Sequence, residues 1–254
     1  MVKLTLIQGD SLKVMPTIPS ESVDLIVADP PYFILDREKW DNFQSEEEYV
    51  KFTETYLNES YRLLKNGSSC FLFWSERHLF LFGDILRKTS FRLYKIVVWH
   101  YPNILKGFSN KKWHNTYDFI FHLVKGEKPK TFNASFADGE NKDVWVFPRP
   151  QSNFKKDKTL HPTQKPLELV KRIVKMFSNE GEVILDPFLG SGTTMVACKE
   201  LKRNCIGIEI NPEYIQIAKT RLNWGSSLLN DIEWEFKIFQ NENNTDNLLN
   251  VIQA

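Results

Sequence analysis

The fold is decided by the stretch from 183 to 194, which reads Val183-Ile184-Leu185-Asp186-Pro187-Phe188-Leu189-Gly190-Ser191-Gly192-Thr193-Thr194. An apolar segment leads into a turn with two glycines and then into a helical pattern, as in nucleotide-binding turns between a strand and a helix. The next apolar segment ends in Glu209, 19 residues after Gly190, close to the spacing of about 20 at which an acid binds ribose hydroxyls. No lysine follows the second glycine, so the turn does not match a triphosphate-binding loop. A glycine helix cap followed by an unrelated exposed glutamate is the simpler alternative.

Around this unit, short apolar segments alternate with longer segments of helical periodicity, which is typical of a parallel sheet flanked by helices. The pattern predicts seven strands, at 4–8, 23–28, 69–74, 93–99, 117–124, 183–185 and 205–208. It predicts helices at 46–64, 78–88, 166–177, 193–201 and 212–222, two of which begin with a proline, a residue favoured in the first turn. We therefore expect an α/β fold with a central, mostly parallel seven-stranded sheet and helices on both faces.

A second motif, Asp29-Pro30-Pro31-Tyr32, directly follows the apolar segment 23–28. In an open α/β sheet, ligands bind at the carboxyl ends of the strands, so this motif is expected to face the ligand crevice. The prolines restrict the backbone, and the motif then presents a carboxylate, a carbonyl and an aromatic ring in one small volume. This set suits a flat ring with an exocyclic NH2 group, which Asp29 and the Pro30 carbonyl can accept while Tyr32 stacks. A proline-rich turn with a buried tyrosine is the structural alternative.

The length and composition fit one catalytic domain. The chain has 254 residues, 42% hydrophobic and 26% charged, and no apolar run long enough to span a membrane. The first residues are too short an apolar stretch for a signal peptide, so we expect an intracellular, cytoplasmic protein. Cys70, Cys198 and Cys205 lack C-x-x-C spacing, which argues against a metal site or a disulfide framework. We assign a domain at 1–225, with a polar, basic insertion at 126–160, and a C-terminal extension at 226–254.

The charge is unevenly distributed along the chain. Residues 105–175 contain 15 Lys and Arg against 7 Asp and Glu, although the whole chain carries only +1. A basic middle segment suits a polyanion, but it also suits a solvated surface. The candidates for phosphate contacts are Lys111, Lys112, Arg149, Lys155, Lys156 and Lys158, and those for base stacking are Trp113, Trp145 and Phe154. The alternative is that these lysines only aid solubility and these aromatic residues belong to the core.

The two motifs, with His161-Pro162-Thr163-Gln164-Lys165-Pro166 just before the second, resemble the amino-methyltransferases of bacterial restriction–modification systems. The match is to the circularly permuted beta class, in which D-P-P-Y precedes the cofactor motif, and it runs from about residue 4 to residue 222. The resemblance implies a Rossmann-like methyltransferase fold and S-adenosylmethionine as the cofactor. It also implies DNA as partner, no membrane, a homodimer, and a cognate restriction endonuclease as a functional rather than physical partner.

The resemblance also implies roles for individual residues. Asp29, Pro30, Pro31 and Tyr32 would form the catalytic loop. The cofactor would be held by Asp10, His161, Thr163, Lys165, Asp186, Phe188, Gly190, Ser191, Gly192, Thr193 and Glu209. Among these, Glu209 would bind the ribose, Asp10 would lie near the adenine, and His161, Thr163 and Lys165 would hold the methionine carboxylate. Segment 126–160 would recognise the target sequence, although it is short for the family.

Several activities remain open at this point. In the family, D-P-P-Y marks adenine N6 enzymes more often than cytosine N4 enzymes, so adenine N6 is the expected target and cytosine N4 or RNA the alternatives. A binding module without activity and a small-molecule methyltransferase are the other classes. Cytosine C5 methylation needs an activated thiolate nucleophile, which is a cysteine directly after a proline. None of the three cysteines follows a proline, so this class of enzyme is excluded.

Overall fold

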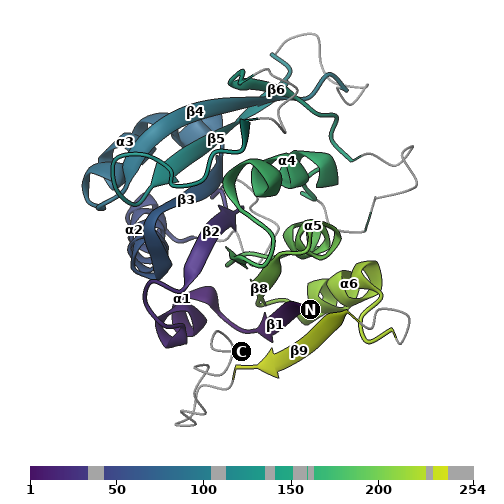
Figure 1. Ribbon diagram of the computed structural model, residues 1–254. Coiled ribbons are helices and arrows are strands. Elements are labelled where there is room, and N and C mark those ends of the chain that lie inside the picture. The colour runs from purple at the N-terminus through teal and green to yellow at the C-terminus, as the bar shows by residue number, and fades with distance from the viewer. Residues whose placement is uncertain are drawn as a thin grey trace.

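The described residues of the computed structural model form one nine-stranded sheet with helices on both faces (Figure 1). The structure describes residues 1–33, 43–103, 113–134, 141–150, 159, 163–226 and 231–239. The strands are β1 Val2–Gln8, β2 Val23–Ala28, β3 Leu64–Trp74, β4 Arg92–His100, β5 Tyr117–Val124, β6 Val144–Val146, β7 Val183–Asp186, β8 Asn204–Glu209 and β9 Ile232–Ile238. The α-helices are α1 Ser11–Val14, α2 Glu46–Leu63, α3 Leu79–Arg87, α4 Leu167–Phe177, α5 Thr193–Leu201 and α6 Pro212–Leu222. Short 3-10 helices cover Met15–Thr17 and Glu76–His78.

The sheet is mostly parallel, as expected. Its strand order is β6-β4-β5-β3-β2-β7-β8-β1-β9, and β5 alone runs antiparallel to both of its neighbours, β3 and β4. At the centre, β2 pairs with β7, with Leu25 opposite Ile184 and Ile26 opposite Leu185. The ends of these two strands therefore lie side by side although one comes early in the chain and the other late.

The described sheet has nine strands, two more than the seven expected. Strand β6 lies inside the predicted insertion, where Val144, Trp145 and Val146 pair in parallel with β4. Three residues are too few to show a period in the sequence. Strand β9 lies in the predicted C-terminal extension and pairs in parallel with β1. Its apolar residues alternate with charged ones, a strand pattern that the sequence analysis overlooked.

Two apolar clusters cover the two faces of the sheet. Alternate residues of β2 divide between them: Leu25 and Val27 belong to the cluster under α4, α5 and α6. Ile26 and Ala28 belong to the cluster under α1, α2 and α3. The alternation follows from the pleat of the strand, and both faces are buried, as in other parallel sheets. No helix in the described part of the chain is long and apolar enough to cross a membrane.

Helix α2 begins after Ser45, its N-cap residue. The Ser45 hydroxyl accepts from the backbone N–H of Glu48, at 3.2 Å, and the Glu48 carboxylate accepts from the backbone N–H of Gln44, at 2.7 Å. These contacts satisfy N–H groups that have no partner inside the helix. The helix then buries Tyr49 and Tyr56 against the sheet, which brings its aromatic face beside the candidate site.

Candidate active site at the carboxyl ends of the central strands

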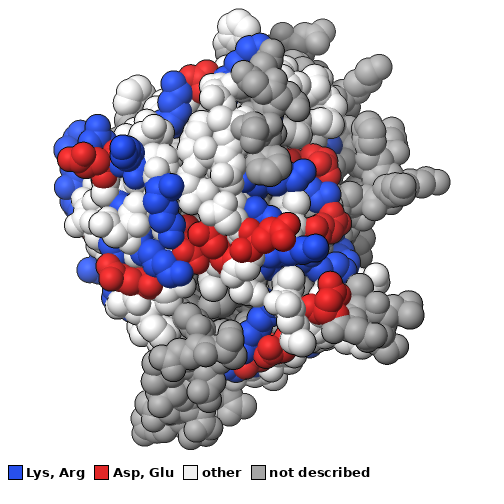
Figure 2. All heavy atoms as spheres, viewed as in Figure 1, with Lys and Arg blue, Asp and Glu red and all other residues white. Residues whose placement is uncertain are grey.

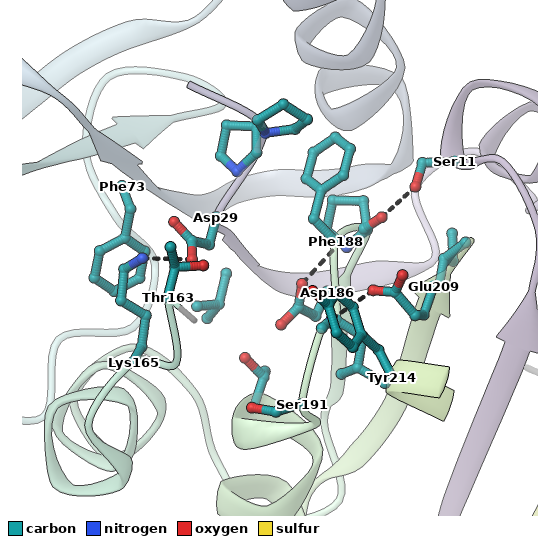
Figure 3. A pocket seen from close by; sticks show the side chains of 18 of the residues that line it. Ser11, Asp29, Phe73, Thr163, Lys165, Asp186, Phe188, Ser191, Glu209 and Tyr214 are labelled. Atoms are coloured by element: carbon teal, nitrogen blue, oxygen red, sulfur yellow. Dashed lines mark hydrogen bonds and ion pairs between the residues drawn. The ribbon is translucent and has the colours of Figure 1, made fainter. Parts of the chain in front are cut away.

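A cavity of about 350 Å³ lies where β2, β7 and β8 end, and it is lined by residues of both predicted motifs. Figure 3 shows its two sides. Asp29, Phe73 and Lys165 lie on one side, and Asp186, Glu209 and Tyr214 lie on the other. The pairing of β2 with β7 creates this arrangement, because parallel neighbours end at the same edge of a sheet.

On the first side, the Asp29 carboxylate has two side-chain partners. The Tyr32 hydroxyl donates to Oδ1, and the Lys165 ammonium donates to Oδ2 and forms an ion pair with it. Burial, followed by the nearby Asp29 charge, raises the pKa of Tyr32 well above its usual value. Tyr32 therefore keeps the proton that it donates to Asp29. The Lys165 ammonium also lies 5.4 Å from the centre of the Tyr32 ring and 5.1 Å from that of Phe73.

The predicted catalytic loop, Asp29 to Tyr32, continues into a residue with unusual backbone geometry. Phe33 has a φ of 55°, in the left-handed region that bulky residues seldom adopt. Its ring packs among those of Phe43, Tyr49 and His78, with centroid distances of 5.8, 5.7 and 6.1 Å. These contacts hold the Phe33 ring in place directly after Tyr32.

On the second side, backbone N–H groups hold the acidic side chains. One Glu209 oxygen accepts from the N–H of Gly190 and the other from that of Asn211, each at 2.7 Å. The Asp186 carboxylate accepts from the N–H of Phe188 at 3.0 Å. Burial raises the pKa of Glu209, although these backbone donors oppose the change.

Asp186 titrates in a very different range from an exposed aspartate. Burial raises the pKa of its carboxyl to about 7, and the nearby charges of Asp29 and Glu209 act in the same direction. Hydrogen bonds from Thr194 and from the Phe188 N–H lower it in part. Asp186, Asp29 and Glu209 make the cavity acidic, which favours a ligand with positive charge and hydroxyl groups.

Gly192 holds the loop from Asp186 to Thr193 in place without lining the cavity. It adopts a φ of 83°, and a Cβ added to it would lie 2.9 Å from the Cβ of Ala218. The position therefore requires glycine both for its backbone conformation and for the close approach of α6. Gly190, Ser191 and Thr193 are among the described lining residues and Gly192 is not, so a contact between Gly192 and the cofactor stays a prediction.

The segment from Thr163 to Lys165 joins the two sides of the cavity. The Thr193 hydroxyl donates to the backbone carbonyl of Lys165 at 3.4 Å, while the Lys165 side chain extends to Asp29 (Figure 3). The Gln164 side-chain oxygen accepts from both the N–H and the hydroxyl of Thr159, at 2.9 and 2.8 Å. Thr163 also lines the cavity, whereas His161 lies outside the described residues.

Comparison with known proteins identifies the family. A family model described as DNA methylase matches residues 23–220. The chain belongs to this DNA methylase family. It is 32% identical to the type II methyltransferase M.HinfI of Haemophilus influenzae, over 90% of this chain and 71% of that protein.

Solved structures agree with this assignment of the methylase. The M1.HpyAVI complex with S-adenosylmethionine covers 87% of this chain and 99% of its own, with a TM-score of 0.69 and 28% identity. The cytosine-N4-specific PvuII DNA methyltransferase covers 86% of this chain and 87% of its own, with a TM-score of 0.74. At 20% identity, this second likeness shows the fold alone. The Rossmann-like methyltransferase fold expected from the sequence is confirmed.

The donor set of the methylase cavity fits S-adenosylmethionine. Asp186 and Glu209 supply acceptors for hydroxyl and ammonium groups, and Phe188 and Tyr214 supply aromatic faces for an adenine ring. Lys165 is the one cationic side chain among the described lining residues and suits a carboxylate. No cluster of metal-ligating side chains occurs in the described ranges.

Some lining residues of the methylase were missed in the sequence, namely Ser11, Phe52, Phe73 and Tyr214. Asp10, which was predicted, lines the cavity and caps α1 through the N–H of Leu12 at 3.0 Å. The adjacent Ser11 donates to the Pro187 carbonyl, which joins the first strand to the cofactor loop. Phe73 lies next to the end of β3, a position that the strand-end rule used for Asp29 could have identified.

The candidates for DNA contacts have different surroundings in the methylase. The Arg149 guanidinium pairs with Asp118 at 3.0 Å and lies 3.6 Å from the centre of the Tyr101 ring. Trp113 is exposed, but Trp145 is buried, so the interpretation of Trp145 as a base-stacking residue is wrong. It packs instead into the core beneath α4, with Arg172 5.0 Å from its ring centre. Lys111, Lys112, Phe154, Lys155, Lys156 and Lys158 lie outside the described residues.

Proposed function

We propose that the protein transfers a methyl group from S-adenosylmethionine to the N6 amino group of a flipped-out adenine at a specific site in DNA. The observation that carries the proposal is the meeting of Asp29 and Tyr32 with the loop from Asp186 to Thr193 around one cavity. A methyl donor and a flat amino-bearing ring can thus meet at the end of β2. Adenine is chosen over cytosine because the motif reads D-P-P-Y.

Bound S-adenosylmethionine supplies an electrophilic methyl group on a sulfonium and leaves as a thioether. Because the thioether is a good leaving group, the positioning of the methyl donor and the acceptor nitrogen matters most. A covalent enzyme intermediate is not required. The N6–CH3 bond forms as the S–CH3 bond breaks, and the sulfur keeps the electron pair of that bond.

The catalytic loop prepares the amino group of the base for its attack on the methyl group. Asp29 and the Pro30 carbonyl accept the two amino hydrogens, so they stabilise the pyramidal nitrogen that develops in the transition state. The amine then loses one proton, which the Asp29 carboxylate can accept. Tyr32 stacks on the extruded base, and such a stack offsets part of the unstacking cost by about 1–3 kcal/mol.

The test is methylation of plasmid DNA, single- and double-stranded, with isotopically labelled S-adenosylmethionine, followed by mass spectrometry of the nucleosides. Label in N6-methyladenine is the expected result, and sequencing of the product then maps the site. Label in N4-methylcytosine would mean that the target base is cytosine, with the methyl transfer otherwise as proposed. No label in either DNA form, with cofactor bound, would overturn DNA as the substrate and direct the assay to RNA.

The basic segment supports DNA as the partner. We propose Lys111, Lys112, Arg149, Lys155, Lys156 and Lys158 as phosphate contacts. Each neutralised phosphate steepens the dependence of DNA affinity on salt. Replacing Lys155, Lys156 and Lys158 together by alanine should flatten that dependence by a slope of about 3, measured by anisotropy at several salt concentrations. An unaltered slope would place the phosphate contacts elsewhere.

The family resemblance adds three parts to the proposal. They are a homodimer, a cognate restriction endonuclease as a functional partner, and a cytoplasmic location. Sedimentation of the purified protein, with and without DNA, tests the first part directly.

A further inference from the structure

Lys165 belongs to both sides of the cavity at once. Its backbone carbonyl accepts from Thr193 at the start of α5, on the cofactor side. Its ammonium ends on the catalytic side, at Oδ2 of Asp29. The side chain is 10% exposed, so its charge lies where water weakens electrostatic interactions little.

In the proposed reaction, two carboxylates need the ammonium of Lys165 as an ion-pair partner. In the structure it pairs with Asp29, whose other oxygen already accepts from Tyr32. The proposed cofactor brings a carboxylate of its own, and the described lining offers that group no cation other than Lys165. Asp29, in turn, has to accept amino hydrogens from the base. A carboxylate oxygen that gives up a strong donor becomes a better acceptor for the next one.

The groups around Lys165 favour movement of its ammonium from one nearby carboxylate to another over its release to water. The rings of Phe73 and Tyr32 lie within 5.1 and 5.4 Å of its ammonium. The Asp118 carboxylate also faces the Lys165 ammonium. Burial raises the pKa of Asp118, and the positive charges of Lys165 and Arg149 lower it only in part. The ammonium thus stays inside an aromatic and acidic enclosure whichever carboxylate it contacts.

We propose that Lys165 couples cofactor binding to capture of the target base, by passing from Asp29 to the cofactor carboxylate and so freeing Asp29 to accept the amino group. The inference rests on the proposed function and makes Lys165 a positioning residue for Asp29. Coupling between two ligands is reciprocal, so the captured base should also strengthen binding of a cofactor that carries a carboxylate.

The test compares two cofactor analogues on the unaltered protein. S-adenosylhomocysteine carries the amino acid carboxylate, and 5′-methylthioadenosine lacks it. A duplex that keeps adenine at the target position of the mapped site and carries 2-aminopurine beside it reports base extrusion, because the fluorescence of 2-aminopurine rises when its neighbour leaves the stack. At saturating analogue, DNA affinity and emission should be higher with S-adenosylhomocysteine, and the affinity should differ by about tenfold, within the usual range of coupling between sites.

The variant Lys165→Met should remove this difference between the analogues. DNA affinity should become equal with either analogue, and the preference of the free protein for S-adenosylhomocysteine should shrink. Lys171→Met is the matched control, because Lys171 lies on α4 and pairs with Glu168 and Glu200, away from the cavity. The control should keep the full difference.

Equal DNA affinity and emission with both analogues on the unaltered protein would overturn the coupling and leave the methyltransferase proposal intact. So would a difference that survives in Lys165→Met. Absence of any emission change with either analogue, on a site shown to be methylated, would instead contradict base extrusion in the proposed function. The comparison on the unaltered protein decides the matter even if Lys165→Met does not fold.

Discussion

The two sides of the cavity are held by different kinds of contact. On the cofactor side, backbone N–H groups bind the carboxylates of Asp186 and Glu209, and both residues are buried. On the catalytic side, Asp29 is held by the side chains of Tyr32 and Lys165. Backbone donors keep their direction as long as the turn persists, whereas side chains can exchange partners. We therefore expect the proposed cofactor side to be formed before ligands bind, and the proposed catalytic side to rearrange when they do.

The largest expected effect comes from Asp29→Ala. Turnover should fall by at least about 10²–10³-fold, while S-adenosylhomocysteine should bind at least as tightly, because Asp29 no longer competes for the Lys165 ammonium. Single-turnover rates and calorimetry measure the two quantities. Asp84→Ala, on the exposed face of α3, is the control. A loss of cofactor affinity equal to the loss of rate would show that the two sides are not separate.

The next largest effect is expected for Glu209→Ala, on the cofactor side. It removes a proposed ribose contact and leaves the N–H groups of Gly190 and Asn211 without their acceptor. A hydrogen bond to a charged group contributes about 1.5–3 kcal/mol, so calorimetry should show a loss of affinity of about 10–100-fold. Glu213→Ala, in the exposed first turn of α6, should not change it. An unchanged affinity in Glu209→Ala would remove this residue from the site.

Gly192→Ala tests whether the cofactor loop depends on its backbone. The left-handed φ and the close approach to Ala218 should together lower the free energy of unfolding by about 2–3 kcal/mol. Gly181→Ala is a matched control, because Gly181 has a φ of 80° with nothing within 4 Å of the added Cβ. Denaturant unfolding should show the larger loss in Gly192→Ala. Equal losses would mean that the contact with α6 contributes nothing.

The smallest expected effect, when measured over a single pH unit, is a pH dependence of stability caused by Asp186. Its pKa of about 7 in the folded protein lies above the ordinary value of 3.8, so the folded state binds more protons between these values. The free energy of unfolding should therefore fall as pH rises from about 4 to 7, by at most about 1.4 kcal/mol per pH unit. Asp186→Asn should flatten this slope in denaturant unfolding at pH 5, 6 and 7. An identical slope in both proteins would mean that Asp186 does not titrate in this range.

The sequence predicted most of the fold because its apolar periods are long enough to recognise. Strand β6 was missed because three residues show no period, and the burial of Trp145 depends on its pairing with β4. The catalytic and cofactor motifs were predicted from their places at strand ends, and the cavity unites them. The contact between Lys165 and Asp29 could not be predicted, since it depends on β2 lying beside β7. Phe52 and Tyr214 resemble ordinary amphipathic helix residues until the cavity is seen.

The pairing of Leu25 with Ile184 has a consequence for how this enzyme could change. Between β2 and β7 the chain forms β3, β4, β5 and β6, which extend the sheet beyond β2, and it then returns to the cavity at Lys165. Hydrogen bonds between β2 and β7 keep the ends of these two strands side by side, whatever the length of the chain that joins them. We therefore expect that exchange of segment 126–160 outside β6, the segment predicted to recognise the target, would alter which DNA is read while the two motifs keep their places.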